Sequence, residues 1–117
     1  QTKNHAEAVK AANEIKAINP ENGYAYFLLG QCYAASANCS EITCQACYWA
    51  AFDAMSKAVN LLASEPDIQK AAQTMMSHYR AAFPTKEECF FAELQAGANY
   101  TVTRGFANGV NTTVRYR

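Results

Sequence analysis

The sequence lacks an excess of charge of either sign. Ten acidic residues balance ten basic ones among 117 residues, so the formal net charge is zero. A chain without net charge exerts no strong overall attraction on a polyanion or on an anionic membrane surface. We therefore expect no nucleic-acid partner.

A long apolar run is also missing. Residues 22–40 carry no charged side chain, but Asn22, Gln31 and Asn38 lie among them. A membrane-spanning helix needs about 20 predominantly apolar residues, so this stretch is predicted to be a buried helix of a soluble fold rather than a membrane span. The chain has no initiating Met and no cleavable leader. We expect it to be a processed product or a piece of a longer protein.

Cysteine, in contrast, is frequent, although the count of five is odd. Cys39, Cys44 and Cys47 have the C-x4-C-x2-C spacing that plant-type ferredoxins use, with Cys89 downstream. The loop lacks the glycines that let backbone amides approach a cluster, and the Cys44–Cys47 pair lacks the βαβ context of a redox CxxC motif. We expect no metal and no cofactor. A thiol-based redox or metal-binding protein using Cys39, Cys44 and Cys47 is the alternative.

The remaining cysteine chemistry depends on the compartment. Cys39 and Cys44 lie close enough in sequence to form a loop disulfide if the compartment is oxidising, but sequence cannot fix the connectivity. Cys32 and Cys89 are expected to be small buried apolar groups.

We predict no catalytic residues. His78 stands on a predicted helix, and no Cys, Ser or carboxylate lies at a spacing from it that catalysis would recognise. An enzyme that uses Cys44, Cys47 or His78 is the alternative from a different class of protein.

Apolar residues recur with a helical period over most of the first 96 residues. Gly30 in the second helix costs roughly 1 kcal/mol relative to Ala unless the missing side chain permits close approach. Thr85 and Glu88 form a predicted capping box at the start of the fifth helix, and Gly97 is the predicted cap at the end of that fifth helix. The predicted helices are Asn4–Ile18, Gly23–Ala37, Tyr48–Leu62, one from near Pro66 to Phe83, and Thr85–Ala96.

From Asn99 onward the period changes to two, which predicts a β-hairpin at 99–117. The alternating residues include Tyr100, Val102, Val110, Thr112, Val114 and Tyr116. A two-residue turn at Asn108-Gly109 would put the two apolar sets on opposite faces, so we expect a bulge or a wider loop. Because a lone hairpin is marginal in water, one face should cover the fourth and fifth predicted helices.

The residues that follow Pro20 resemble the first helix of a tetratricopeptide repeat. Tyr26, Leu29-Gly30 and Tyr33 match its aromatic, Leu-Gly and Tyr positions. A similar match to the second helix of the repeat is carried by Ala51, Met55 and Ala58. The resemblance implies a mainly α fold of tetratricopeptide-like α-α superhelical repeats at 1–98, with a small C-terminal β-hairpin at 99–117 packed on the helices. An insertion at 36–43 departs from the family pattern.

The tail resembles the C-terminal end of a group of bacterial cell-envelope proteins with tetratricopeptide-like repeats. The resemblance is carried by FPTKEECFFAELQAGANYTV and NTTVRYR. It implies a bacterial cell-envelope location, periplasmic or associated with the outer membrane, and no established enzymatic role.

The repeat resemblance also implies a ligand-facing surface on the second helix, opposite its packing face. The residues placed there are Tyr24, Phe27, Gln31, Ala34 and Ala35. An aromatic pair with an amide suits a peptide or a sugar-like partner; the alternative is that Tyr24 and Phe27 pack on a neighbouring repeat. We expect a non-enzymatic protein-protein interaction scaffold or adaptor that binds a protein or peptide segment, as part of a larger bacterial envelope protein.

Overall fold

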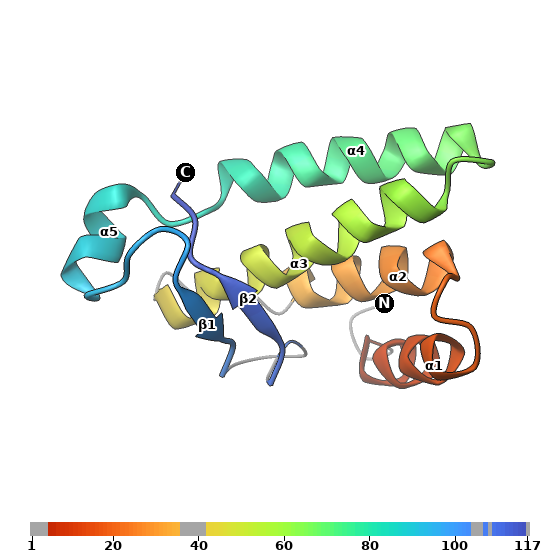
Figure 1. Ribbon diagram of the computed structural model, residues 1–117, viewed down its shortest axis with the longest axis horizontal. Helices are drawn as coiled ribbons and strands as arrows, with labels where there is room; N and C mark the ends of the chain where they lie inside the picture. Colours follow the sequence, from red (N-terminus) through yellow and green to blue (C-terminus); the bar gives the residue numbers. More distant parts are fainter. Residues whose placement is uncertain (1–4, 36–41, 104–106, 108, 117) are drawn as a thin grey trace.

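Five helices precede a small two-stranded sheet in the described part of the chain (Figure 1). The computed structural model describes residues 5–35, 42–103, 107 and 109–116. The elements are α1 (His5–Ile18), α2 (Gly23–Ala35), α3 (Ile42–Leu61), α4 (Pro66–Ala81), α5 (Lys86–Phe91), β1 (Asn99–Thr101) and β2 (Asn111–Thr113). The prediction of a mainly α fold with a small C-terminal hairpin is confirmed at this level.

The long helix α3 is the element on which most of the structure packs. It lies against α2 and α4, β2 crosses it, and α1 packs on α2 (Figure 1). A helix that is apolar on nearly all sides is expected to be buried. The buried side chains of α3 are Ala46, Cys47, Trp49, Ala50, Ala51, Ala54, Met55 and Ala58.

Close approach between α2 and α3 depends on Gly30, as predicted. A Cβ atom at this position would lie 2.9 Å from Cγ of Met55 and 3.2 Å from the carbonyl oxygen of Ala51. Both contacts are tighter than carbon normally tolerates, and Met55 is itself fully buried. The low helix propensity of a mid-helix glycine is therefore offset by the closer packing of α2 on α3 that the missing side chain permits.

The short helix α5 begins as predicted and ends earlier than predicted. The Thr85 hydroxyl accepts a hydrogen bond from the Glu88 amide at 3.1 Å, and the Glu88 carboxylate accepts one from the Thr85 amide at 2.8 Å. The helix stops at Phe91 instead of Ala96, so the assignment of Gly97 as its cap was wrong.

The early end of α5 has a defined backbone cause. Glu93 adopts a left-handed conformation with φ of 61°. The Leu94 amide donates to the Cys89 carbonyl at 2.8 Å and the Glu93 amide to the Phe90 carbonyl at 3.0 Å. This is a Schellman arrangement, with a glutamate in the position that glycine usually takes.

The hairpin has the wider loop that the apolar pattern predicted. Tyr100 pairs with Thr112, and the Val102 amide donates to the Val110 carbonyl at 2.9 Å. The connection therefore lies between Val102 and Val110, and residues 104–106 and 108 within it fall outside the described residues. In this register the even-numbered residues of both strands share one face, because each pair joins two residues of the same parity.

That shared face lies on α3, which corrects the prediction that it covers the fourth and fifth helices (Figure 1). The Trp49 ring meets the Tyr100 ring edge to face, with 5.5 Å between centroids. Val102 and Val114 are fully buried in the same cluster as Cys89 of α5. Hairpin and helices thus share a single hydrophobic cluster, in which α3 supplies the main partner surface.

Candidate functional site

The predicted ligand-facing surface of α2 is partly exposed. Tyr24 is 48% exposed and Ala35 is also exposed, whereas Phe27, Gln31 and Ala34 are half-buried. The opposite side of α2 is committed to the core through Ala25, Leu29, Cys32 and Tyr33. The aromatic side chain most available to a partner on this helix is therefore that of Tyr24.

This surface of α2 borders α4. The Gln31 side-chain amide donates a long, weak hydrogen bond to the Met75 sulfur at 3.8 Å. Partial desolvation, and then the charge of the Glu65 carboxylate at the start of α4, raise the pKa of the Tyr24 hydroxyl. A ligand on Tyr24 would thus contact both helices, and the Gln31 amide is not wholly free to meet it.

The described cysteines are interior groups. Cys32, Cys47 and Cys89 are buried, which matches the prediction for Cys32 and Cys89. Burial raises the pKa of the Cys32 and Cys89 thiols. Both groups therefore stay protonated at neutral pH, whereas the thiolate is the form that acts as a nucleophile.

The predicted loop disulfide lies outside the described residues. Cys39 falls in the gap between α2 and α3, and Cys44 belongs to α3 by its backbone alone, without a described side chain. Among the residues whose side chains are described, no three His, Cys, Asp or Glu side chains come together as a metal site. His78 is exposed on α4.

A pocket that the sequence did not indicate lies between α1, α2, α3 and the start of β2. Its volume is about 180 Å³, well above the roughly 30 Å³ that one water molecule takes up in the liquid. The apolar lining is Leu29, Ala50, Ala54 and Val110, with the rings of Tyr26 and Tyr33; the charged lining is Lys16, Asp53 and Lys57.

Two of the charged groups in this pocket meet one aromatic ring. Nζ of Lys16 lies 5.3 Å and Nζ of Lys57 lies 5.5 Å from the centroid of the Tyr26 ring. An ammonium group at this distance is attracted by the negative face of the ring. Within the described residues, neither lysine has a carboxylate at ion-pair distance.

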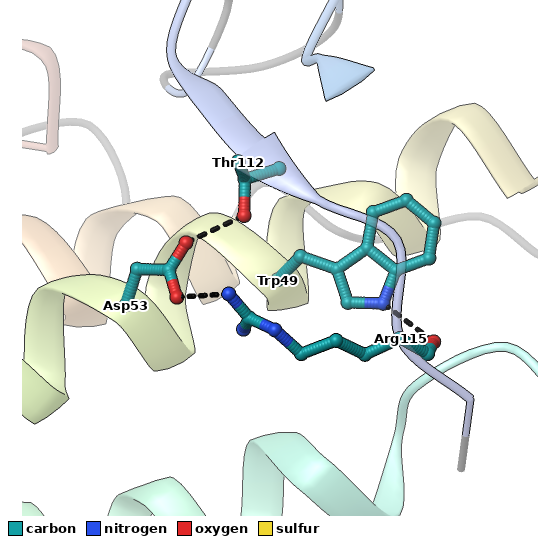
Figure 2. A network of polar contacts seen from close by, with 4 residues as sticks. All are labelled: Trp49, Asp53, Thr112 and Arg115. Carbon is teal, nitrogen blue, oxygen red and sulfur yellow. Dashed lines mark hydrogen bonds and ion pairs between the residues drawn. The ribbon is translucent and has the colours of Figure 1, made fainter. Parts of the chain in front are cut away.

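The third charged group, Asp53, is already engaged (Figure 2). Its Oδ2 accepts a hydrogen bond from the Thr112 hydroxyl at 2.5 Å, and its Oδ1 forms an ion pair with Nη2 of Arg115. The Arg115 carbonyl in turn accepts a hydrogen bond from Nε1 of Trp49 at 2.9 Å. The hairpin thereby neutralises Asp53, and the pocket keeps the charges of Lys16 and Lys57.

Sequence reasoning missed this pocket for an identifiable reason. Asp53 precedes Lys57 by one helical turn, a spacing at which such residues usually pair. Nothing local indicates that Thr112 and Arg115, about sixty residues away, take the carboxylate instead.

A second exposed aromatic group lies on α5. Phe90 and Phe91 are 76% and 84% exposed, with 6.0 Å between their ring centroids. They border a shallow hollow with Glu93, Leu94 and Gln95. A pair of exposed Phe rings on a six-residue helix is a large apolar surface for one small element.

Comparisons of the chain with protein-family models, with curated proteins and with solved structures found no match. No helix in the described ranges combines the length and the apolar character needed to cross a membrane. The candidate sites are the surface of α2 and the pocket beside it.

Proposed function

We propose that the protein is a non-enzymatic protein-interaction module, built on tetratricopeptide-like helical pairs, that binds a protein or peptide segment along α2. The segment lies on the surface defined by Tyr24, Phe27 and Gln31, with α4 as the second wall. In the wider proposal the module is part of a larger bacterial cell-envelope protein.

The arrangement of the helices supports this proposal. Consecutive helices pack on one another from α1 to α4, and Gly30 brings α2 close to α3 at the position where the repeat family places its Leu-Gly pair. The resemblance of the tail to bacterial envelope proteins is the sole support for the location.

The observation that carries the proposal is the exposure of Tyr24 at the edge of a helix whose other side is buried. A Tyr side chain buries a large area on binding and loses little conformational entropy. Its position beside Glu65 and α4 gives a partner two helices to contact. Phe27, half-buried next to it, extends the same apolar surface.

Selection from a random peptide library, followed by calorimetric titration of the selected peptide, tests the proposal. Tyr24→Ala should weaken binding by about tenfold or more, as the loss of a central aromatic contact does, and should leave the melting temperature nearly unchanged. The matched control is the double variant Phe90→Ala and Phe91→Ala, which removes exposed rings on α5 and should bind normally.

The same series identifies the result that contradicts the proposal. If the α5 variant loses binding and Tyr24→Ala does not, the interaction surface is on α5 instead. If Phe27→Ala unfolds the protein, that ring belongs to the core and the surface is reduced to Tyr24. If no peptide is selected, the interaction function is not supported.

A further inference from the structure

The pocket between α1, α2 and α3 has the composition of a binding site for an organic anion. We infer that it binds a carboxylate group carried on an apolar or aromatic body, with the ammonium groups of Lys16 and Lys57 on the carboxylate. This inference goes beyond the proposed function, because the pocket uses Tyr26 and Leu29, on a different side of α2 from Tyr24.

Charge supports the anionic character of the ligand. Lys16 comes from α1 and Lys57 from α3, so the fold brings together two cations that are far apart in sequence. Two like charges near one ring repel each other, and an anion bound between them would offset that repulsion by attracting both. The carboxylate in the pocket lining, that of Asp53, is instead held by Arg115 and Thr112.

The rest of the lining supports the apolar body. Leu29, Ala50, Ala54 and Val110 form an apolar wall with the two tyrosine rings. A mainly apolar lining with a few polar groups at defined places is the lining that small-ligand sites share. A free inorganic ion would leave the apolar wall in contact with water, so a carboxylate with an attached hydrocarbon group fits better than phosphate.

The lysines suit a carboxylate that reaches the pocket from solvent. Lys57 is exposed and Lys16 is half-buried. An entering anion would therefore meet the ammonium group of Lys57 in solvent and that of Lys16 at the lining of the pocket. Their long stems let both groups adjust around the ligand. Ring contacts with Tyr26 place both ammonium groups beside the pocket.

The experiment is an NMR titration of the isotope-labelled protein with phenylacetate, and with phenylacetamide as the uncharged control. Phenylacetate should shift the amide signals of residues around Lys16, Tyr26 and Lys57, and the amide should bind at least about tenfold more weakly. Raising the ionic strength from about 0.01 M to about 0.15 M should weaken phenylacetate binding, because exposed charges are screened.

Variants locate the site. Lys16→Met with Lys57→Met should lower the affinity about tenfold or more, since both charges are lost and the stems are kept. Lys70→Met, on the exposed side of α4, is the matched control and should bind normally. Because Lys57 is exposed, Lys57→Met alone tests the inference if the double variant does not fold.

One further variant leaves both lysines in place. Arg115→Met releases the Asp53 carboxylate, which then pairs with Lys57 one turn away and competes with the ligand. It should therefore weaken phenylacetate binding although it removes no group that contacts the ligand. Tyr24→Ala should have no effect, which separates this site from the proposed peptide surface.

The source of the carboxylate is tested with an acetylated tetrapeptide ending in Leu, either with a free C-terminus or amidated. Binding of the free acid and not of the amide supports a peptide terminus as ligand, and binding of phenylacetate alone supports a small carboxylic acid. Equal binding of acid and amide, or binding of inorganic phosphate alone, overturns the inference. So does the absence of any shift in the wild-type protein.

Discussion

The two sides of α3 are held by different kinds of contact. Toward α2 the surface is made of small and flexible apolar groups, with Gly30 set against Ala51 and Met55. Toward the hairpin it presents one large ring, Trp49, and one carboxylate, Asp53, both hydrogen-bonded to the C-terminal strand region (Figure 2).

The difference shows how near and distant parts of the chain attach to the same helix. The α2 side joins consecutive helices, so close packing of small residues suffices once the loop has brought them together. The hairpin side joins residues that are 59 to 66 positions apart. Directional hydrogen bonds there fix the register of a short ribbon that could otherwise slide along an apolar surface.

The largest effect should come from the hairpin side. Trp49→Ala should lower the free energy of unfolding by about 3–5 kcal/mol, because it leaves a cavity under Tyr100 and removes the donor to the Arg115 carbonyl. Urea denaturation followed by circular dichroism measures the loss.

Trp49→Phe is the control for this prediction, since it keeps a ring and removes the N–H group. Its cost should be smaller, with about 1 kcal/mol for the hydrogen bond in addition to the lost ring volume. If Trp49→Ala costs less than Trp49→Phe, the account of the hairpin contact is wrong.

A smaller effect is expected on the α2 side. Gly30→Ala should destabilise the protein by about 1–3 kcal/mol because the added methyl group meets Met55 and the Ala51 carbonyl. It should do so despite a gain of about 1 kcal/mol in helix propensity. The melting temperature and the urea midpoint measure the change. A stabilised Gly30→Ala variant would show that a methyl group fits between α2 and α3.

Gly97→Ala is the matched control for the steric explanation. Among the described residues, no atom other than those of its chain neighbours lies within 4 Å of a Cβ placed there, but φ is +86°. Its cost should therefore come from backbone strain alone, about 1–2 kcal/mol. A cost near zero would mean that the positive φ at Gly97 imposes no strain on an alanine.

The smallest effect concerns the α4 side of α3 at alkaline pH. Burial first, and then nearby Tyr48 and Cys32, raise the pKa of the Tyr79 hydroxyl to about 12, above its ordinary value of about 10. The folded state therefore holds this proton more tightly. The resulting stability is complete below pH 10 and is lost as pH rises to about 12.

Urea midpoints measured across that pH range test the prediction. Tyr79→Phe should reduce the slope of stability against pH, but not abolish it, because burial also raises the pKa of Tyr33 and Tyr100. A slope identical to that of the wild-type protein would mean that the Tyr79 hydroxyl ionises freely in the folded state.

The parts of the fold that were predictable depend on local patterns. The helical period indicated α3 from Tyr48 onward, although this helix begins at Ile42. The Thr85–Glu88 pair indicated the start of α5, and Gly30 indicated close packing of α2. The end of α5 was not predictable, because Glu93 adopts a conformation that Gly97 was better suited to take. The backbone hydrogen bonds that close α5 fix its end at this point, although glycine is the residue that usually adopts this conformation.

The candidate sites divide in the same way. Tyr24 was assigned to an accessible surface from a family resemblance, and its side chain is half exposed; whether it meets a partner remains a prediction. The pair of Lys16 and Lys57 gave no signal, because its existence depends on α1 packing near α3 and on the hairpin engaging Asp53. Both conditions are tertiary contacts, which the spacing of residues within one helix cannot indicate.

The hydrogen bond between the indole of Trp49 and the Arg115 carbonyl has a practical consequence. Trp49 is the single tryptophan of the chain and is fully buried beneath the hairpin. Its fluorescence therefore reports the docking of the C-terminal ribbon. Release of the hairpin would bring the indole into water and shift its emission to longer wavelength, even where the helices, and with them the far-ultraviolet signal, stay intact.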